Sequence, residues 1–221
     1  MNSFSIKHLL VTAILCLSSF VNAQSSKLTI GLETGPTISF LRGNDLMKET
    51  GFPLLDYSAG VNTCYSFTRF FGLQSGLLFE NKGNTFKGTA VDVGSGYLGV
   101  YKGKNRFSYL TLPFMFKLQM GDQLKFYVNA GPYLAYLMQV QYQSEFNNLK
   151  VINNDRSNYH YFDWGLSLGC GTSVKVANRY RINLECRNQY GLRNISNGPV
   201  YNNGTVMTNA LSVLLGFGMD L

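Results

Sequence analysis

The C-terminal segment of the chain alternates hydrophobic with mostly small or polar residues. Odd-numbered positions from Leu211 to Leu221 are all hydrophobic, and residues such as Ser212, Gly216 and Asp220 lie between them. Successive side chains of a β-strand point to opposite faces, so this period of two predicts a strand with one apolar face and one more polar face.

The same period recurs in eight segments of the chain. They cover approximately residues 28–40, 55–67, 71–82, 110–120, 124–142, 161–176, 180–192 and 211–221. The gaps after the second, fourth and sixth segments are about 3 residues long, whereas the other gaps run from about 14 to 27 residues. Short turns at one end and long loops at the other are typical of outer-membrane barrels with both termini in the periplasm.

Charged residues within these segments all fall on the polar face, and acidic and basic groups are equal in number. Because an isolated buried charge is costly, such groups are expected to pair in a narrow lumen. We predict that they form a structural ionic network there. Its members are Glu33, Asp56, Glu80, Lys117, Lys125, Asp163, Lys175, Arg181, Glu185 and Arg187, with Lys82 and Asp220 on the same face.

A soluble β-sandwich would show the same alternation with its apolar face turned inward. Aromatic residues near the segment ends favour the membrane alternative, since they are typical of interfacial girdles. They are Phe40, Tyr65, Phe67, Phe71, Tyr142, Phe162, Trp164, Tyr180 and Tyr190. We therefore predict an all-β fold, an eight-stranded antiparallel up-and-down transmembrane β-barrel. Leu112 and Leu215 would face lipid, and the lumen would be filled by side chains.

Apolar positions in the fifth segment predict the orientation of its outer part. Leu134, Tyr136, Met138 and Val140 would face lipid, and Gln139 would face the lumen. Pro36 and Pro132 interrupt two predicted strands because proline cannot donate to the ladder. Each follows a glycine, so we expect local β-bulges there.

Cys170 and Cys186 are predicted to be cross-strand neighbours. If residues 177–179 form the turn, the two cysteines lie directly opposite each other on the lipid face. Two free thiols and a disulfide are both open at this stage, since register can slip and bridge geometry is restrictive.

Residues 1–23 have the three parts of a secretory signal peptide. Lys7 and His8 begin it, an apolar core follows, and Val21-Asn22-Ala23 precedes the expected cleavage site. The domain organisation is thus a signal peptide (1–23) and an outer-membrane barrel (24–221). No run of about 18 apolar residues occurs elsewhere, which argues against helical membrane spans.

Composition and net charge indicate which classes of binding partner to expect. The chain is 45% hydrophobic and 14% aromatic, which excludes a disordered protein, and its formal net charge is +7. The excess comes from the predicted loops, in Arg42 and Lys48 and in Lys87, Lys102, Lys104 and Arg106. Expected partners are outer-membrane lipid and lipopolysaccharide phosphates, although ordinary solvated loop charge is the alternative. No basic strip interleaved with aromatics supports nucleic-acid binding.

Catalytic and metal-binding patterns are missing from the sequence. The mature chain would keep three widely spaced cysteines and one histidine, His160, with no metal-ligand spacing. A serine hydrolase needs a base within reach of its hydroxyl, and no serine is suitably spaced from His160. We predict no enzymatic activity, no catalytic residues, no cofactor and no metal.

Several strand motifs resemble a known family. Tyr109-Leu-Thr-Leu-Pro113-Phe-Met-Phe-Lys117, Gly131-Pro-Tyr133, Phe162-Asp163-Trp-Gly165-Leu-Ser-Leu-Gly169 and Tyr190-Gly-Leu-Arg-Asn194-Ile are similar to strands of the Bacteroidetes outer-membrane β-barrel family called PorT-like. The resemblance covers essentially the whole mature chain and implies an OmpA-like eight-stranded barrel. Most members of that family have no assigned activity, and one branch is linked to protein secretion across the outer membrane.

Three functions remain open from the sequence. The first is a non-enzymatic barrel with a filled lumen and long extracellular loops, which stabilises the envelope or contacts partner proteins. The second is an accessory component of secretion, as the PorT-like resemblance implies. The third is a small channel for ions or solutes.

Overall fold

A computed structural model describes residues 27–92, 96–146 and 149–221. The predicted signal peptide lies outside these residues. The elements in chain order are β1 (Lys27–Arg42), α2 (Asp45–Thr50), β2 (Gly51–Ser66), β3 (Phe71–Asp92), β4 (Gly96–Gly121), β5 (Leu124–Phe146), β6 (Leu149–Asn153), β7 (Phe162–Lys175), β8 (Tyr180–Gly191), the 3-10 turn η1 (Tyr201–Asn203) and β9 (Met207–Asp220).

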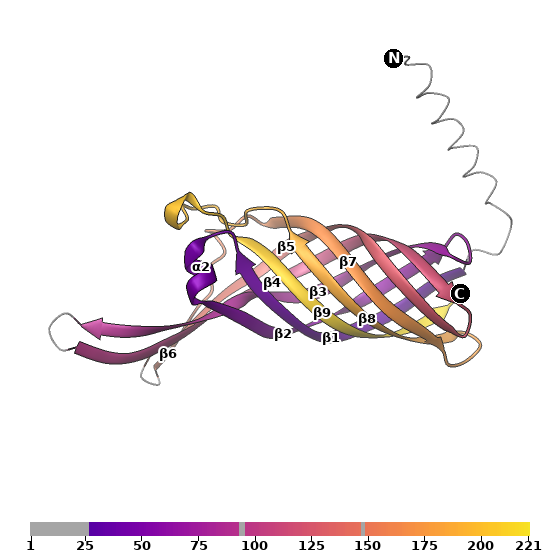
Figure 1. Cartoon of the computed structure of the whole chain (residues 1–221), viewed down its shortest axis with the longest axis horizontal. Helices are drawn as coiled ribbons and strands as arrows, with labels where there is room; N and C mark the ends of the chain where they lie inside the picture. The colour runs from indigo at the N-terminus through magenta and orange to yellow at the C-terminus, as the bar shows by residue number, and fades with distance from the viewer. Residues whose placement is uncertain (1–26, 93–95, 147–148) are drawn as a thin grey trace, which may run out of the picture.

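Eight of these strands form a closed antiparallel ring (Figure 1). The order is β4-β3-β2-β1-β9-β8-β7-β5, and β5 pairs back onto β4. β6 stands outside the ring and pairs only with the outer end of β5. A closed ring leaves no open sheet edge, so each of the eight ring strands pairs with a neighbour on both sides. The predicted eight-stranded barrel is confirmed.

The wall of the barrel is apolar outside and polar inside. Leu112, Phe116, Leu168 and Leu215 are exposed on the outer surface, with Leu215 57% exposed, while Glu33, Arg187 and Ser212 are buried. Large exposed side chains of this kind ring the whole barrel, as a hydrocarbon environment requires. None of the helices in the described part of the chain is long and apolar enough to cross a membrane.

The turns sort to the two ends of the barrel as expected. In Figure 1 the short connections β2–β3, β4–β5 and β7–β8 lie at the right-hand end, together with the C-terminus. The β2–β3 turn is held by Thr68, whose Oγ1 accepts hydrogen bonds from the backbone amides of Phe70 and Phe71. A bond of 2.7 Å from Thr29 Oγ1 to Asp220 Oδ1 joins the two ends of the described chain there.

The second predicted long loop is a β-hairpin in the structure. The gap of about 27 residues between the third and fourth predicted segments is mostly strand, because β3 continues to Asp92 and β4 begins at Gly96. The two strands stay paired from Phe71↔Leu118 to Asp92↔Gly96 and extend as a hairpin beyond the barrel at the left of Figure 1. The segment is rich in Gly, Lys and Asn. Because this hairpin does not lie in lipid, it needs no apolar face, and the alternation that predicts a membrane strand is missing.

The predicted orientation at the outer end of β5 was also wrong. Val140, expected to face lipid, is 1% exposed, whereas Gln139, expected inside, is exposed. The β4–β5 register shifts between Ser108↔Gln139 and Tyr109↔Leu137, which leaves Met138 unpaired as a β-bulge. An extra residue reverses the side-chain alternation that follows it. For the same reason Tyr142 packs against the inner cluster rather than joining the outer aromatic girdle.

The proline positions keep their register, and the predicted bulges are absent there. β1 pairs with β9 up to Thr34↔Leu215 and resumes at Thr37↔Ser212 with the same offset. Gly35 precedes Pro36 at a close approach, since a Cβ there would lie 1.8 Å from the Val213 carbonyl oxygen. Proline removes one donor without requiring an extra residue, so the ladder is interrupted on one side only.

Cys170 and Cys186 lie directly opposite each other, as the turn position predicted. Both are exposed on the outer surface and both are free, as is Cys64. We expect residues 24–221, refolded without reductant, to show three thiols when titrated in denaturant. A titre of one thiol that rises to three after reduction would contradict the free pair.

Candidate functional site

The centre of the lumen holds a buried ionic cluster. Arg187 Nη1 lies 2.7 Å from Glu33 Oε1, and Arg187 Nε lies 2.7 Å from Glu185 Oε1. Arg187 Nη2 also donates to Glu33 Oε2 at 3.2 Å. All three side chains are almost completely buried. One guanidinium therefore bridges two carboxylates contributed by β1 and β8, in a site with little access to water.

Neutral donors complete the coordination of both carboxylates. Glu185 accepts hydrogen bonds from Tyr127 Oη at 3.0 Å, Asn129 Nδ2 at 3.1 Å and Gln74 Nε2 at 3.1 Å. Glu33 accepts from Asn62 Nδ2 at 2.6 Å. Buried charges are tolerated when paired and hydrogen-bonded in this way, so the cluster ties β1, β2, β3, β5 and β8 together across the lumen.

A second buried polar cluster lies in the part of the lumen nearer the long connections. Lys82 Nζ donates to Gln189 Oε1 at 2.5 Å and lies 3.5 Å from Glu80 Oε2. Gln189 Nε2 in turn donates to Glu80 Oε1 at 2.9 Å. The ammonium group also lies 4.6 Å from the centre of the Tyr133 ring, a favourable cation–π distance.

A hydrophobic cluster occupies the outer end of the lumen. It combines inward residues of β4 and β5, including Phe107, Tyr109 and Leu137, with Ile195 and Val206 from the β8–β9 connection. That connection is anchored by Asn194, whose Oδ1 accepts hydrogen bonds from the backbone amides of Ser196 and Val206. The cluster fills the outer end with apolar side chains.

Tyr159, in the connection between β6 and β7, lies over this hydrophobic cluster. Its ring contacts Phe107 edge to face, with ring centres 4.9 Å apart, and burial raises the pKa of its hydroxyl. The phenol is therefore neutral at physiological pH and adds no charge to this hydrophobic cluster, which we call the hydrophobic plug.

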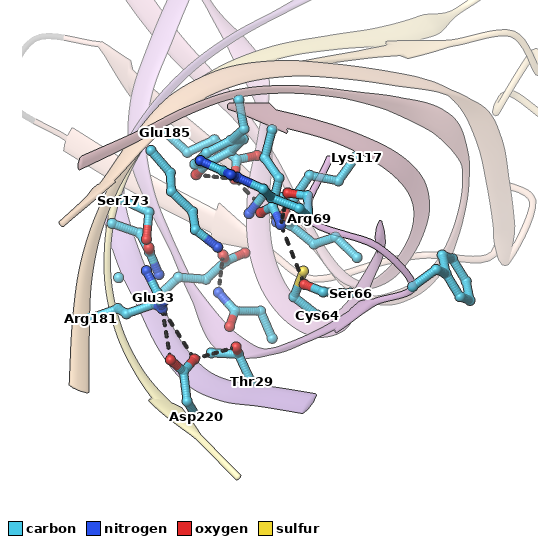
Figure 2. Close-up of a pocket in the computed structure, with 18 of the residues that line it drawn as sticks. Thr29, Glu33, Cys64, Ser66, Arg69, Lys117, Ser173, Arg181, Glu185 and Asp220 are labelled. Carbon is cyan, nitrogen blue, oxygen red and sulfur yellow. Dashed lines mark hydrogen bonds and ion pairs between the residues drawn. The ribbon is translucent and has the colours of Figure 1, made fainter. Parts of the chain in front are cut away.

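The opposite half of the lumen is hollow. A cavity of about 470 Å³ lies between Glu33 and Glu185 on one side and the β2–β3 turn residues Thr68 and Arg69 on the other. Figure 2 shows residues that line it. Lys117, Lys125, Arg181 and Asp220 line its wall. Arg181 Nε and Asp220 Oδ2 form an ion pair of 2.9 Å near the mouth. The lumen thus has a polar cavity at the end with the short turns, which is the expected periplasmic end, and packed side chains at the end with the long connections.

The ten residues predicted to form one ionic network fall into several separate groups in the structure. Glu33, Glu185 and Arg187 form the central cluster, and its two glutamates also line the floor of the cavity. Lys117, Lys125 and Arg181 line the cavity wall. Glu80 belongs to the Lys82 cluster, and Asp163 accepts hydrogen bonds from Thr208 and Tyr133 at 2.8 and 3.3 Å. Lys175 makes no side-chain ion pair within the described residues.

Asp56 lies apart from the other network residues. Its Oδ2 is 2.7 Å from Arg106 Nη2 and 3.5 Å from Lys104 Nζ, and its Oδ1 accepts from Asn81. Arg106 alternates on β4 with the inward Phe107, and the β2–β3 register shifts between Pro53 and Ser58. A register irregularity next to Asp56 could not be inferred from the alternation.

Residues of the hydrophobic plug were missed by reasoning from the sequence. Ile195 and Val206 lie in a segment rich in Asn and Gly that was predicted as an extracellular loop, and Phe107 lies in the second predicted loop. Their only signal was isolated hydrophobic residues within polar segments. Which of these residues packs into the barrel depends on the path of the connection.

The eight-stranded ring and its filled lumen are typical of small outer-membrane barrels. The family model described as outer membrane protein beta-barrel domain matches residues 22–197, and the chain belongs to this family. No curated protein matches the sequence.

Solved structures with a similar arrangement of strands share little sequence with the chain. Ail, the attachment invasion locus protein of Yersinia pestis, is 10% identical, with a TM-score of 0.46 and coverage of 90% of this chain and 100% of Ail. Neisserial surface protein A is 9% identical, with a TM-score of 0.47 and coverage of 88% and 97%. Escherichia coli outer membrane protein W is 12% identical, with a TM-score of 0.41 and coverage of 90% and 100%. The family match and the closed ring of strands identify the protein as an outer-membrane β-barrel.

Proposed function

We propose that this protein is a non-enzymatic surface-display barrel. The filled barrel anchors the chain, and the ordered sheet beyond the membrane contacts lipopolysaccharide and partner proteins. The observation that carries the proposal is strand length. A strand needs about 9–11 residues to cross a bilayer. β3, β4 and β5 have 22, 26 and 23 residues, so about half of each extends past the membrane.

The outer sheet supports contact with a protein partner. β6 pairs with β5 from Tyr142↔Asn153 to Phe146↔Leu149, and its other edge lies outside the ring. Leu149 and Val151 on this strand are 73% and 62% exposed. An exposed strand edge offers backbone donors and acceptors to an extended segment of another protein. We therefore assign the protein-binding role to this edge.

A photo-crosslinking amino acid at Val151 tests this role in cells that express the protein natively. We expect adducts with one or a few surface or outer-membrane proteins. The same crosslinker at Val213, which lies on the lipid face of β9, serves as the control and should give none of these adducts. Equal adducts at both positions, or none at Val151, would contradict the proposed display role.

Lipopolysaccharide contact is assigned to Lys104 and Arg106 at the base of the hairpin. Both pair with Asp56 and keep side-chain exposures of 27% and 33%, so one carboxylate is shared by two cations. The remaining positive charge suits a phosphate group, which guanidinium binds through charge-assisted hydrogen bonds. We expect Arg106→Gln to lower the lipopolysaccharide retained on purification, and Lys87→Gln, farther out on the hairpin, to leave it unchanged.

A continuous channel is disfavoured by the filled outer half of the lumen. Phe107, Leu137 and Ile195 are completely buried at that end, and Lys82 and Arg187 are locked in ion pairs. In planar bilayers we expect the protein to give no stable conductance steps. Reproducible steps from a preparation free of porins would overturn the non-conducting assignment. The secretion role implied by the PorT-like resemblance stays a prediction, since no contact within the described residues favours it.

A further inference from the structure

Four basic and four acidic side chains line the periplasmic cavity. Glu33 and Glu185 on its floor are paired with Arg187, which leaves Asp122 and Asp220 as the other carboxylates. Lys117 from β4, Lys125 from β5 and Arg181 from β8 line it, and Asp220 is the carboxylate opposite Arg181. The Arg69–Asp122 pair at the rim is neutral in sum. The floor cluster contributes one net negative charge and the remaining lining groups two net positive charges, so the site as a whole carries one positive charge. A net positive charge in a concave site with low-dielectric walls attracts anions.

Lys117 carries the strongest indication of a missing partner. Its side chain is buried, with the residue only 9% exposed, and its ammonium lies 3.6 Å from the centre of the Tyr127 ring. Within the described residues it has neither a hydrogen-bond acceptor nor an ion-pair partner. An ammonium has three donors, and those of Lys117 are open to the cavity rather than to a protein acceptor. The group lines the cavity, where a ligand can reach it (Figure 2).

Arg181 supplies a second unsatisfied donor in the same cavity. Its Nε is occupied by Asp220, at 3.1 and 2.9 Å from the two carboxylate oxygens, but its Nη1 is buried and has no partner. Lys125, which lies at the mouth, likewise makes no ion pair among the described residues. Ser173 and Thr29 place hydroxyl groups on the same wall.

From this arrangement we infer that the periplasmic cavity is a binding site for a small oxyanion, a phosphate or carboxylate group of a periplasmic solute. The volume of about 470 Å³ falls within the range of about 300–1,000 Å³ typical of small-molecule sites. The central Glu33–Arg187–Glu185 cluster forms the closed floor, so the solute enters and leaves from the periplasm. Lys117 binds the anion from the floor side, and Arg181 and Lys125 bind it nearer the mouth. This site is distinct from the outer sheet and does not depend on the display role.

The competing interpretation is purely electrostatic. Glu33 and Glu185 together carry one negative charge more than Arg187, and Lys117 would then balance that charge at a distance without binding anything. The two interpretations differ in one measurable respect. If the cavity binds an anion, adding that anion at constant ionic strength reduces the access of solvent to the cavity. If Lys117 only balances charge, the access stays the same.

Cys64 reports on this access because it also lines the cavity. In a C170A/C186A background it is the remaining thiol of the mature barrel. The refolded barrel is treated with N-ethylmaleimide in sodium chloride, sodium phosphate or sodium succinate of equal ionic strength. At an anion concentration about ten times the Kd we expect labelling to slow about tenfold, because only the unliganded fraction reacts. The phosphate and succinate arms show which oxyanion is preferred.

The Lys117→Met variant should label at the same rate in all three salts, while Lys87→Met on the exposed hairpin should retain full protection. Heat-modifiable mobility on gels checks that each variant is folded. If Lys117→Met fails to fold, Lys125→Met at the half-exposed mouth carries the test and should weaken protection several-fold. Equal labelling of the parent protein in all three salts, or undiminished protection in folded Lys117→Met, would overturn the site.

Discussion

Replacing Arg187 by Met should destabilise the barrel by about 3–5 kcal/mol, since it leaves two buried carboxylates without their counter-charge. Arg187 is the only group that forms ion pairs with Glu33 and Glu185 among the described residues, and both contacts are 2.7 Å. The free energy of unfolding is measured by urea titration in lipid vesicles. Trp164, the single tryptophan, reports the transition from its lipid-facing position.

Arg69→Met is the matched control for this prediction. Arg69 pairs with Asp122 at 2.8 Å, but the two side chains are 56% and 75% exposed, so the loss should not exceed about 1 kcal/mol. The triple variant E33Q/E185Q/R187M removes all three charges and should recover most of the loss. Equal effects of Arg187→Met and Arg69→Met would mean that the central cluster is hydrated rather than buried.

Replacing Leu215 by Arg should cost about 2–4 kcal/mol, because it places a charge on the lipid face within the membrane. Leu215 is 57% exposed on the outer surface and pairs with Thr34 and Leu184 of the neighbouring strands. In a soluble protein the same exposed position would tolerate arginine with little change. The same urea titration in vesicles measures the effect.

Leu221→Arg provides the comparison at the end of the same strand. Leu221 is 63% exposed but lies beyond the last residue of β9, where a charge reaches the interface and should cost at most about 1 kcal/mol. A similar small effect at both positions would show that the apolar surface does not face hydrocarbon. A large effect only at Leu215 fixes both the depth and the orientation of β9.

The alternation predicted the fold closely because a membrane barrel imposes it on every strand. Leu112 and Leu215 face outward and Lys117 and Arg187 face inward, as the period of two indicated. The same arithmetic placed Cys170 opposite Cys186, since a short turn determines the register of the hairpin that it closes. These are local properties, set by neighbouring residues and turn length.

The prediction failed where the chain leaves the membrane or adds a residue. The bulge at Met138 reverses the orientation of Val140, and the register shift beside Asp56 directs that carboxylate to Lys104 and Arg106. The hairpin beyond residue 82 continues as paired strands without an apolar face to mark it. Outside hydrocarbon the alternation is no longer required, so the pattern carries less information there.

By itself the sequence determined that the chain is a lipid-facing barrel, that most charges of its membrane strands face inward, and how the strands succeed one another. Only the tertiary structure decided which charges meet. Glu33 and Arg187 are 154 positions apart and become partners because the closed ring brings β1 and β8 to the same level of the lumen. The tertiary structure also decided that hydrophobic side chains fill the outer end of the lumen and that Lys117 faces a cavity. Contacts across a lumen depend on strand tilt and stagger, which are properties of the whole ring rather than of any single strand.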